Sequence, residues 1–388
     1  MTVAHRAPRA ALVVVALLVA STAAITRSSP SAHADLTYCA RHYVANGDDV
    51  PAGHDISDSE RYPSHLLNDH LLKYGGPWCL YSTAANGTTS SDFYNGSGGG
   101  ASQLSQTWSH APDLITVNLG EQDPTIVDNV STCFDDFSGG PTPPHQMAEA
   151  LTCESAILAD QSAFDSLANN LVYIFNQYKK ILDGRPALYI VVVGYPNMYP
   201  DSTSVISKQQ SLCQDTQDAV QLCTIQWSPF SSALAIADQV IQKLNTTIKN
   251  AVSPFTTASQ GHFIFVNPYD KFKDHYMKMD VTLRLDIVCH LCGTDGTYFD
   301  SHSSDQDFGP STPWIKDEAD GNGFPTYLLP TDPTAPDQPT VNVLVSQTTS
   351  GMGKYPNDTG QKCISDLIWE AVKQKLRVPE AANSNICQ

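Results

Sequence analysis

Four short runs of the 388-residue chain are dense in valine, isoleucine and aromatic residues, and turn residues follow each of them. The runs are Arg41 to Asn46, Leu114 to Gly120, Ala187 to Pro196 and His262 to Asp270. A short apolar run bounded by turn residues is typical of a strand that is buried on both faces, as in a parallel sheet. We therefore expect these runs to form one parallel sheet.

Three longer segments carry apolar residues at three- and four-residue spacing, which predicts amphipathic helices. They are Glu154 to Leu182, Ala233 to Val252 and Gln361 to Arg377. Strands that alternate with helices predict right-handed βαβ units, and hence an α/β fold with a parallel sheet of about five strands and helices on both faces. Gly87 to Ala101 and Cys289 to Ser346 are rich in turn residues and are expected to be long irregular loops.

The first 34 residues have the pattern of a secretory signal peptide. Arg6 and Arg9 precede an apolar core at Ala11 to Ala20, and "SAHA" ends at Ala34 as a cleavage point. The apolar core is too short for a comfortable membrane span, and no later stretch reaches the roughly 20 apolar residues that a span needs. We expect a secreted, extracellular protein whose residues 35–388 form one domain with long disulfide-tied loops.

Composition and charge narrow the class of partner. The formal net charge of −18 disfavours nucleic acid and anionic membrane surfaces, so we expect neither as a partner, and we expect a monomer. All ten cysteines follow the signal segment, which predicts up to five disulfides of undetermined pairing. "CHLC" at Cys289 to Cys292 has zinc-like spacing, but no second pair accompanies it, so a disulfide is favoured.

The chain contains Asn-x-Ser/Thr sequons that would accept glycans in a eukaryotic host. They begin at Asn86, Asn95, Asn129, Asn245 and Asn357.

Polar turns follow the predicted strands. Asp48 and Asp49 end the first strand, "LGEQD" at Leu119 to Asp123 ends the second, and "KYPNDTG" at Lys354 to Gly360 introduces the last helix. Functional groups in such sheets gather at the carboxyl ends of the strands, so we expect these turns to converge.

Six segments follow one another in the order known from one family. They are "GDD" with a nearby Ala-Gly, "RYPSHLL" from Arg61, "GEQD" from Gly120, "VVVGYP" from Val191, "KLNTTI" from Lys243, and "YPNDTG" from Tyr355. Together they resemble the SGNH hydrolases, the GDSL esterase and lipase superfamily, in its secreted, disulfide-bonded microbial branch. The resemblance implies the family's α/β fold over nearly the whole mature chain.

The resemblance also implies a catalytic site whose residues are replaced here. Members of the family attack esters with a serine that a histidine deprotonates, while a backbone amide, a glycine and an asparagine hold the oxyanion. By alignment, Asp49 stands for the serine, Gln122 for the asparagine and Tyr355 for the histidine, and a loose match at "WCLYS" places Tyr81 at the glycine. Gln122 keeps an amide donor, but a phenol of pKa about 10 is a poor base at neutral pH.

Two functions follow as hypotheses. The first is a hydrolase-like protein that is catalytically impaired and keeps a cleft for an acyl-ester or glycan ligand. The second is an active esterase that uses a displaced or non-standard nucleophile, with His275 of "FKDH" or His302 of "FDSH" as the rescue base. Site chemistry favours the first, because the nucleophile and the base are replaced together.

Two further interpretations receive less support. Asp48, Asp49 and Asp123 with one of those histidines have the donor chemistry of a metal site, but the paired motifs of metallophosphatases are absent, so we expect no metal or other cofactor. Tyr94 and Trp108 near the glycine-rich segment suggest a sugar- or lipid-binding surface, although core packing is the favoured role.

Overall fold

The computed structural model describes residues 39–54, 56–97, 100–123, 155–198, 220–273, 279–288, 304–308, 324–327, 340–347, 355–377 and 387. Only the backbone is described for 220–234 and for the four strands between Met279 and Gln347. The chain divides into a unit Met1–Cys39 and a unit Ala40–Gln388. The predicted signal peptide, residues 1–34, lies outside the described residues.

A five-stranded sheet forms the centre of the second unit. Its order is β2-β1-β3-β4-β5, and all four pairings are parallel. The strands are β1 (Arg41–Gly47), β2 (Trp78–Ser82), β3 (Leu114–Asn118), β4 (Tyr189–Val193) and β5 (Phe263–Val266). The predicted α/β class and parallel sheet are confirmed. The four predicted runs are β1, β3, β4 and β5, whereas the edge strand β2 was not predicted.

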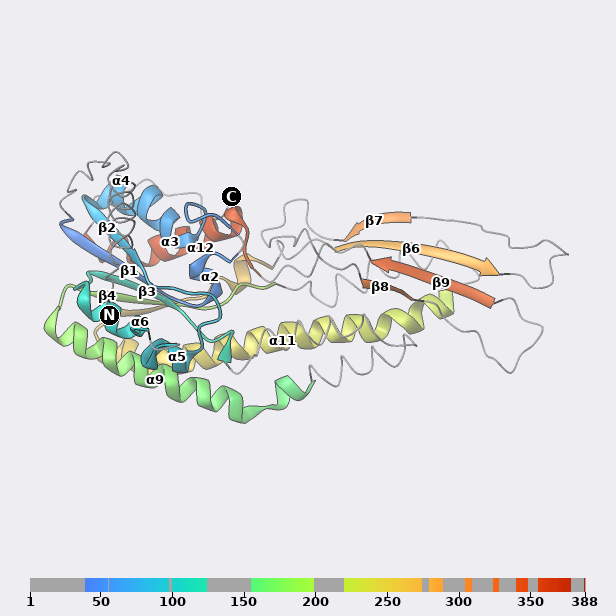
Figure 1. Ribbon diagram of the computed structural model, residues 1–388, viewed down its shortest axis with the longest axis horizontal. Coiled ribbons are helices and arrows are strands. Elements are labelled where there is room, and N and C mark those ends of the chain that lie inside the picture. The colour runs from blue at the N-terminus through green and yellow to red at the C-terminus, as the bar shows by residue number, and fades with distance from the viewer. Residues whose placement is uncertain are drawn as a thin grey trace, which may run out of the picture. The chain divides into compact units, whose positions relative to one another are not determined.

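Two groups of helices cover the two faces of this sheet (Figure 1). One group comprises α5 (Ser90–Asn95), α6 (Gln103–Ser109), α9 (Gln161–Gly184) and α11 (Val220–Ala258). The other comprises α3 (Tyr62–His65), the π-helical turn η1 (Leu66–Leu71), α4 (Leu72–Gly75) and α12 (Asp358–Val372). The predicted helices correspond to α9, α11 and α12, although α11 extends well beyond the predicted segment.

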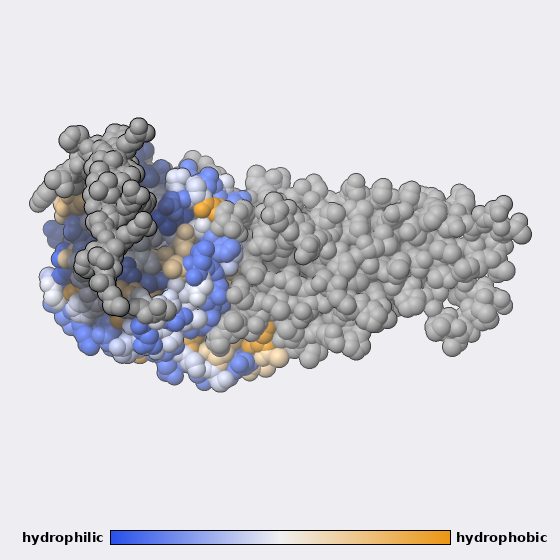
Figure 2. Space-filling model, in the orientation of Figure 1, coloured by the Kyte–Doolittle hydropathy of each residue, from blue (hydrophilic) through white to orange (hydrophobic). Residues whose placement is uncertain are grey.

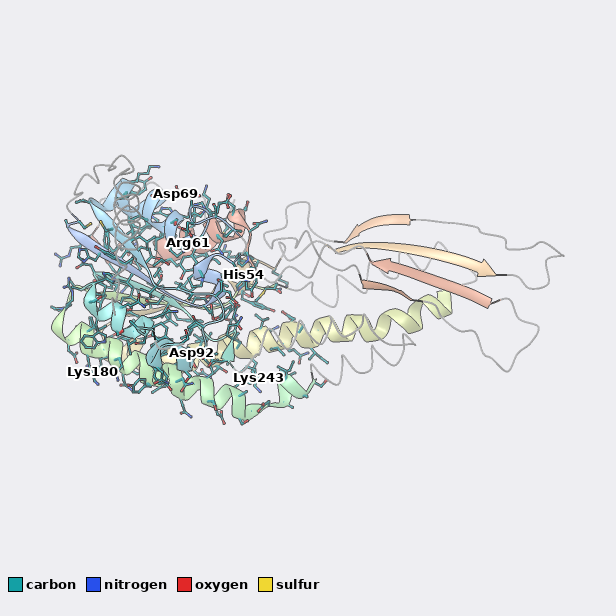
Figure 3. The ribbon with its side chains drawn as sticks, in the orientation of Figure 1. His54, Arg61, Asp69, Asp92, Lys180 and Lys243 are labelled. Carbon is teal, nitrogen blue, oxygen red and sulfur yellow. A yellow bond between two sulfur atoms is a disulfide. The ribbon has the colours of Figure 1, made fainter. Side chains whose placement is uncertain are left out.

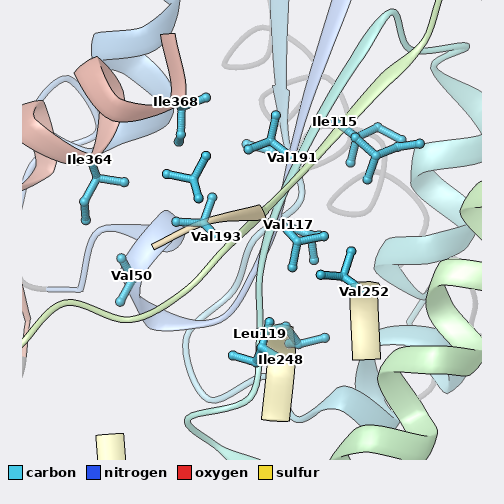
Figure 4. Close-up of a cluster of buried hydrophobic side chains, with 14 of the residues drawn as sticks. Val50, Ile115, Val117, Leu119, Val191, Val193, Ile248, Val252, Ile364 and Ile368 are labelled. Atoms are coloured by element: carbon cyan, nitrogen blue, oxygen red, sulfur yellow. The ribbon is translucent and has the colours of Figure 1, made fainter. Parts of the chain in front are cut away.

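The core lies in two layers, one on each face of the sheet. Figure 4 shows Ile248 and Val252 of α11 on one side of the strands, and Ile364 and Ile368 of α12 on the other. All five residues of β3 are buried, which explains why its sequence reads as a continuous apolar run instead of an alternating one. None of the helices in the described part of the chain is both long enough and apolar enough to cross a membrane.

A second sheet replaces part of the expected irregular region. Its antiparallel order is β7-β6-β9-β8, with β6 (Met279–Val288), β7 (Ser304–Phe308), β8 (Phe324–Tyr327) and β9 (Thr340–Gln347). The expectation of an irregular loop over Cys289 to Ser346 is therefore wrong at β7, β8 and β9, while β6 precedes that segment. The same expectation over Gly87 to Ala101 is wrong at α5. The sequence "TVNVLVSQ" of β9 alternates between valine and other residues, a strand pattern that the abundance of turn residues around it obscured.

Disulfides are present in the described part of the chain. Cys363 and Cys387 are bonded to each other, which ties the C-terminus to α12. Cys39 and Cys79 are also disulfide-bonded. The predicted disulfide use is therefore confirmed for these four cysteines, while the "CHLC" segment lies outside the described residues.

Candidate functional site

The candidate site lies at the carboxyl edge of the five-stranded sheet, immediately after β1. Gly47 ends β1 with a φ of +137°, and a Cβ atom there would approach the carbonyl oxygen of Asn118 to 1.9 Å, so only glycine fits. The chain then turns into the short helix α2 (Asp49–Ala52). This tight turn places Asp48 and Asp49 at the sheet edge beside the end of β3.

Asp49 collects hydrogen bonds from three distant segments. Its Oδ2 accepts from Gln122 Nε2 at 2.6 Å and from the Tyr355 hydroxyl at 2.9 Å. Its Oδ1 accepts from the backbone N–H of Gly87 at 2.7 Å. The three residues singled out by sequence, Asp49, Gln122 and Tyr355, therefore lie in direct contact, although they are 73 and 306 positions apart.

This cluster is closed to solvent. Asp49 is 3% exposed, Gln122 8% and Tyr355 6%. A buried carboxylate is stable only when donors satisfy it, and here both oxygens are satisfied. Charge-assisted hydrogen bonds of this kind are roughly twice as strong as neutral ones. The Asp49 carboxylate thus occupies its site as a bound anion would.

The backbone donor comes from Gly87, not from the region of Tyr81. Tyr81 lies on β2, and its ring stacks on His110 with ring centroids 4.0 Å apart. The loose match of Tyr81 to the family's glycine stays a prediction. Gly87, in the turn at 86–87, has a φ of +72° and its amide is turned toward Asp49.

Asp48, next to Asp49 in the chain, has different surroundings. Its Oδ2 accepts from the Tyr195 hydroxyl and from the Gly120 N–H, the latter at 3.1 Å, while Oδ1 is buried with no partner among the described residues. Burial raises the pKa of Asp48 well above its usual range, and the neighbouring charge of Asp49 adds to the rise, whereas the Tyr195 bond opposes it. Burial therefore disfavours the charged form of Asp48.

Asp123 forms a separate pair with Ser90. Its carboxylate accepts from the Ser90 backbone N–H at 2.7 Å and from the Ser90 hydroxyl. Burial raises the pKa of Asp123 to about 6, although the bonds from Ser90 lower it in part. The Ser90 hydroxyl also accepts from Asn170 Nδ2 at 2.9 Å, so this serine serves to anchor α5.

Two further residues beside the aspartates were not among those predicted from the sequence. His54 follows α2 (Figure 3), and its ring stacks on that of Tyr355 with centroids 4.5 Å apart. Tyr195 binds Asp48 and accepts from the Glu121 N–H at 3.1 Å. His54 could have been found as the first imidazole after the "GDD" turn, and Tyr195 as the tyrosine of the "GYP" segment.

The two proposed rescue bases, His275 and His302, lie outside the described residues. Among the described histidines, the rings of His42 and His262 bond to backbone carbonyls. Those of His65 and His70 bond to carboxylates. None of these five bonds reaches a serine hydroxyl.

The metal interpretation also lacks a suitable arrangement. Asp48, Asp49 and Asp123 turn toward separate sets of donors. Among the residues that the structure describes, no group of three or more His, Cys, Asp or Glu side chains could hold a metal ion.

The aromatic residues near the glycine-rich segment are only partly packed. Tyr94 packs against Tyr173, with ring centroids 4.8 Å apart. Trp108 is 47% exposed, so the favoured core role is wrong for Trp108. The described surface in Figure 2 is otherwise mainly hydrophilic on the face shown.

Comparisons with known proteins identify similar folds only. No family model and no curated protein matches the chain by sequence. Among solved structures the chain is similar to phospholipase A1 from Streptomyces albidoflavus, at 15% identity and a TM-score of 0.40, over 61% of this chain and 83% of that one. It is similar to an esterase from Pseudoalteromonas sp., at 10% identity and a TM-score of 0.36, over 87% of this chain and 99% of that one. It is also similar to an acetylxylan esterase from Geobacillus stearothermophilus, at 9% identity and a TM-score of 0.33, over 61% and 79% of the two chains. These scores are too low to support an inference about the chemistry of this chain.

Proposed function

We propose that this chain is a secreted, single-domain protein of the SGNH hydrolase type whose ester-hydrolysing site is catalytically impaired. The ordered series of six motifs supports the family, and the convergence of Asp49, Gln122 and Tyr355 supports the alignment of the site. Disulfides at Cys363–Cys387 and at Cys39 and Cys79 support an oxidising compartment.

The observation that carries this proposal is the bonding of Asp49. Its carboxylate accepts from Gly87, Gln122 and Tyr355, so the amide donors suited to an oxyanion already hold an anion. A substrate oxyanion would have to displace this carboxylate or lie beside its negative charge. Both alternatives raise the barrier for attack on a carbonyl carbon.

The same geometry disfavours Asp49 as a nucleophile. A carboxylate whose lone pairs are engaged by three donors must give up at least one bond before it attacks. Tyr355 does not assist, because its hydroxyl donates to Asp49 instead of accepting a proton from it. The loss of serine and histidine together is expected to reduce the rate by orders of magnitude.

Any retained ligand would bind at the rim of the site. Asp49 is 3% exposed, whereas the turn at 86–87 and the ring of His54 lie closer to solvent. An acyl-ester or glycan ligand would therefore contact these outer groups and leave the buried carboxylate untouched.

Ester hydrolysis tests the proposal. The purified full chain, Asp49→Ala, and Asp49→Ser combined with Tyr355→His are assayed with p-nitrophenyl acetate and butyrate. We expect the unmodified chain and Asp49→Ala to match the buffer rate, and the double variant to exceed both. Turnover by the unmodified chain that is lost in Asp49→Ala would instead establish an active esterase with an unusual nucleophile.

A further inference from the structure

The sequons of the chain occupy very different environments in the folded protein. Asn129 lies outside the described residues. Asn357 caps α12, where its Oδ1 accepts from the Gly360 N–H at 3.0 Å. Asn86 and Asn95 are exposed, whereas Asn245 is buried. The sequons therefore match the same sequence pattern but differ in the exposure and hydrogen bonding of their asparagines.

Asn245 cannot carry a glycan in the native fold. Its side chain is 4% exposed and bonds to both backbone groups of Tyr195, accepting from the N–H at 2.7 Å and donating to the carbonyl at 2.8 Å. A sugar on Nδ2 would replace one amide hydrogen and place a large polar group between α11 and the end of β4. Molecules modified there would fail to pack.

Asn86 has the opposite environment. It lies in an exposed turn, and the space around the next residue is open, because a Cβ atom added to Gly87 would meet nothing within 4 Å. The hydrogen bonds described for this turn are made by the backbone and by Thr88, and none uses the Asn86 side chain. A glycan on its amide would cost no described contact.

The position of Asn86 relative to the candidate site gives this sequon its significance. Asn86 immediately precedes Gly87, whose backbone N–H donates to Asp49 at 2.7 Å. The neighbouring Thr88 is buried, its hydroxyl donates to Ala85 O at 2.7 Å, and Gln103 Nε2 donates to that hydroxyl. The turn is thus fixed on its inner side and open on its outer side.

We propose that Asn86 is an N-glycosylation site and that its glycan stands over the rim of the Asp49 site. The Asn86 amide nitrogen forms a bond to the anomeric carbon of an oligosaccharide, the bond from that carbon to a lipid pyrophosphate breaks, and the nitrogen loses one proton. This transfer occurs on the unfolded chain in a secretory pathway that supplies the lipid-linked donor. Thr88 is therefore accessible at that stage, although it is buried later.

Site mapping tests the proposal independently of ester hydrolysis. The full chain is secreted from yeast and treated in heavy-oxygen water with a peptide N-glycosidase, which converts a glycosylated asparagine to a labelled aspartate. Peptide mass spectrometry then locates the label. We expect the label at position 86 and none at position 245. An unlabelled peptide at position 86 in the secreted, folded protein would overturn the proposal.

Two matched variants distinguish the loss of a glycan from a loss of stability of the fold. Asn86→Gln is expected to lose one glycan, seen as a faster-migrating band, with an unchanged melting temperature after deglycosylation. Asn245→Gln is expected to keep the same glycans but to melt at a lower temperature, because the pair of bonds to Tyr195 is lost. A band that is unshifted in Asn86→Gln would contradict the assignment of Asn86.

Discussion

Asp48 and Asp49 are neighbours in the chain and both are buried at the end of β1, yet their surroundings are opposite. Asp49 has three donors distributed over both oxygens. The Asp48 carboxyl group is hydrogen-bonded by Tyr195, Gly120 and Glu121, but its Oδ1 is buried with no partner among the described residues, and burial raises its pKa well above the usual range. The two carboxyl groups therefore differ in how their donors are distributed, over both oxygens in Asp49 and away from Oδ1 in Asp48.

The difference bears on the proposed function. Asp49 faces two amide donors and a phenol, the kind of donor set that an oxyanion would need. Asp48 faces the sheet edge and Tyr195, where burial disfavours a charge. Under the proposed function, Asp49 and not Asp48 therefore competes with a substrate oxyanion for its donors.

The largest effect is expected for Asp49→Asn. An asparagine amide has one acceptor oxygen, so it cannot accept all the hydrogen bonds that the two Asp49 oxygens accept. Its NH₂ group would also face at least one N–H or O–H donor. Loss of one charge-assisted bond with a buried donor left unpaired should lower the free energy of unfolding by about 3 kcal/mol. Urea denaturation at pH 7 measures the change, and a loss smaller than that of Asp48→Asn would break the comparison.

A smaller effect is expected from the titration of Asp123. Its pKa is raised to about 6 by burial, so the folded state holds a proton that the unfolded state releases near its ordinary pKa. The contribution of Asp123 to the free energy of unfolding is fully present below about pH 4 and is lost as the pH rises through about 6. Between pH 4 and pH 7 the unmodified chain should therefore lose roughly 2 kcal/mol more stability than Asp123→Asn, which cannot titrate. Thermal melts at pH 4 and pH 7 measure it.

The experiment compares the change in stability between pH 4 and pH 7 in Asp123→Asn with the same change in the unmodified chain. Asp123→Asn keeps an acceptor for Ser90 and cannot titrate, so its stability should change less over this range than that of the unmodified chain. A pH dependence identical in both proteins would show that Asp123 does not titrate near pH 6.

The smallest effect is expected for Asp48→Asn. An amide can place its oxygen at the donors from Tyr195 and Gly120 and its NH₂ group at the position of Oδ1, which has no hydrogen-bond partner among the described residues. The free energy of unfolding at pH 7 should change by less than about 1 kcal/mol. A loss as large as that predicted for Asp49→Asn would indicate that Asp48 is ionised, and would remove the contrast between the two residues.

The sequence predicted the sheet because its central strands are buried on both faces. β1, β3 and β4 are short apolar runs followed by turn residues, and this is the strongest strand pattern in the chain. β2 escaped prediction because most of "WCLYS" is only partly buried at an edge of the sheet. The second sheet escaped because its alternating segments lie among many aspartate, proline and glycine residues.

The contact of Asp49 with Gln122 and Tyr355 was predictable from the sequence, while the role of the three residues stays a prediction. Motif order identified Asp49, Gln122 and Tyr355, since each follows a recognisable strand or precedes the last helix. It could not identify Gly87, because glycine has no side chain and contributes only a backbone N–H. It also could not separate Asp48 from Asp49, because the difference depends on donors from turns after β3 and β4 and from more distant segments, which only the folded chain assembles.

Labelling with a fluorophosphonate, which reacts with any activated serine, tests the central claim most directly. The unmodified full chain is treated beside a secreted serine esterase as positive control and beside Asp49→Ser combined with Tyr355→His. We predict no adduct on the unmodified chain by intact mass spectrometry, because the proposed function assigns the nucleophile position to Asp49 and not to a serine. A stoichiometric adduct on any serine of the unmodified chain would contradict the account.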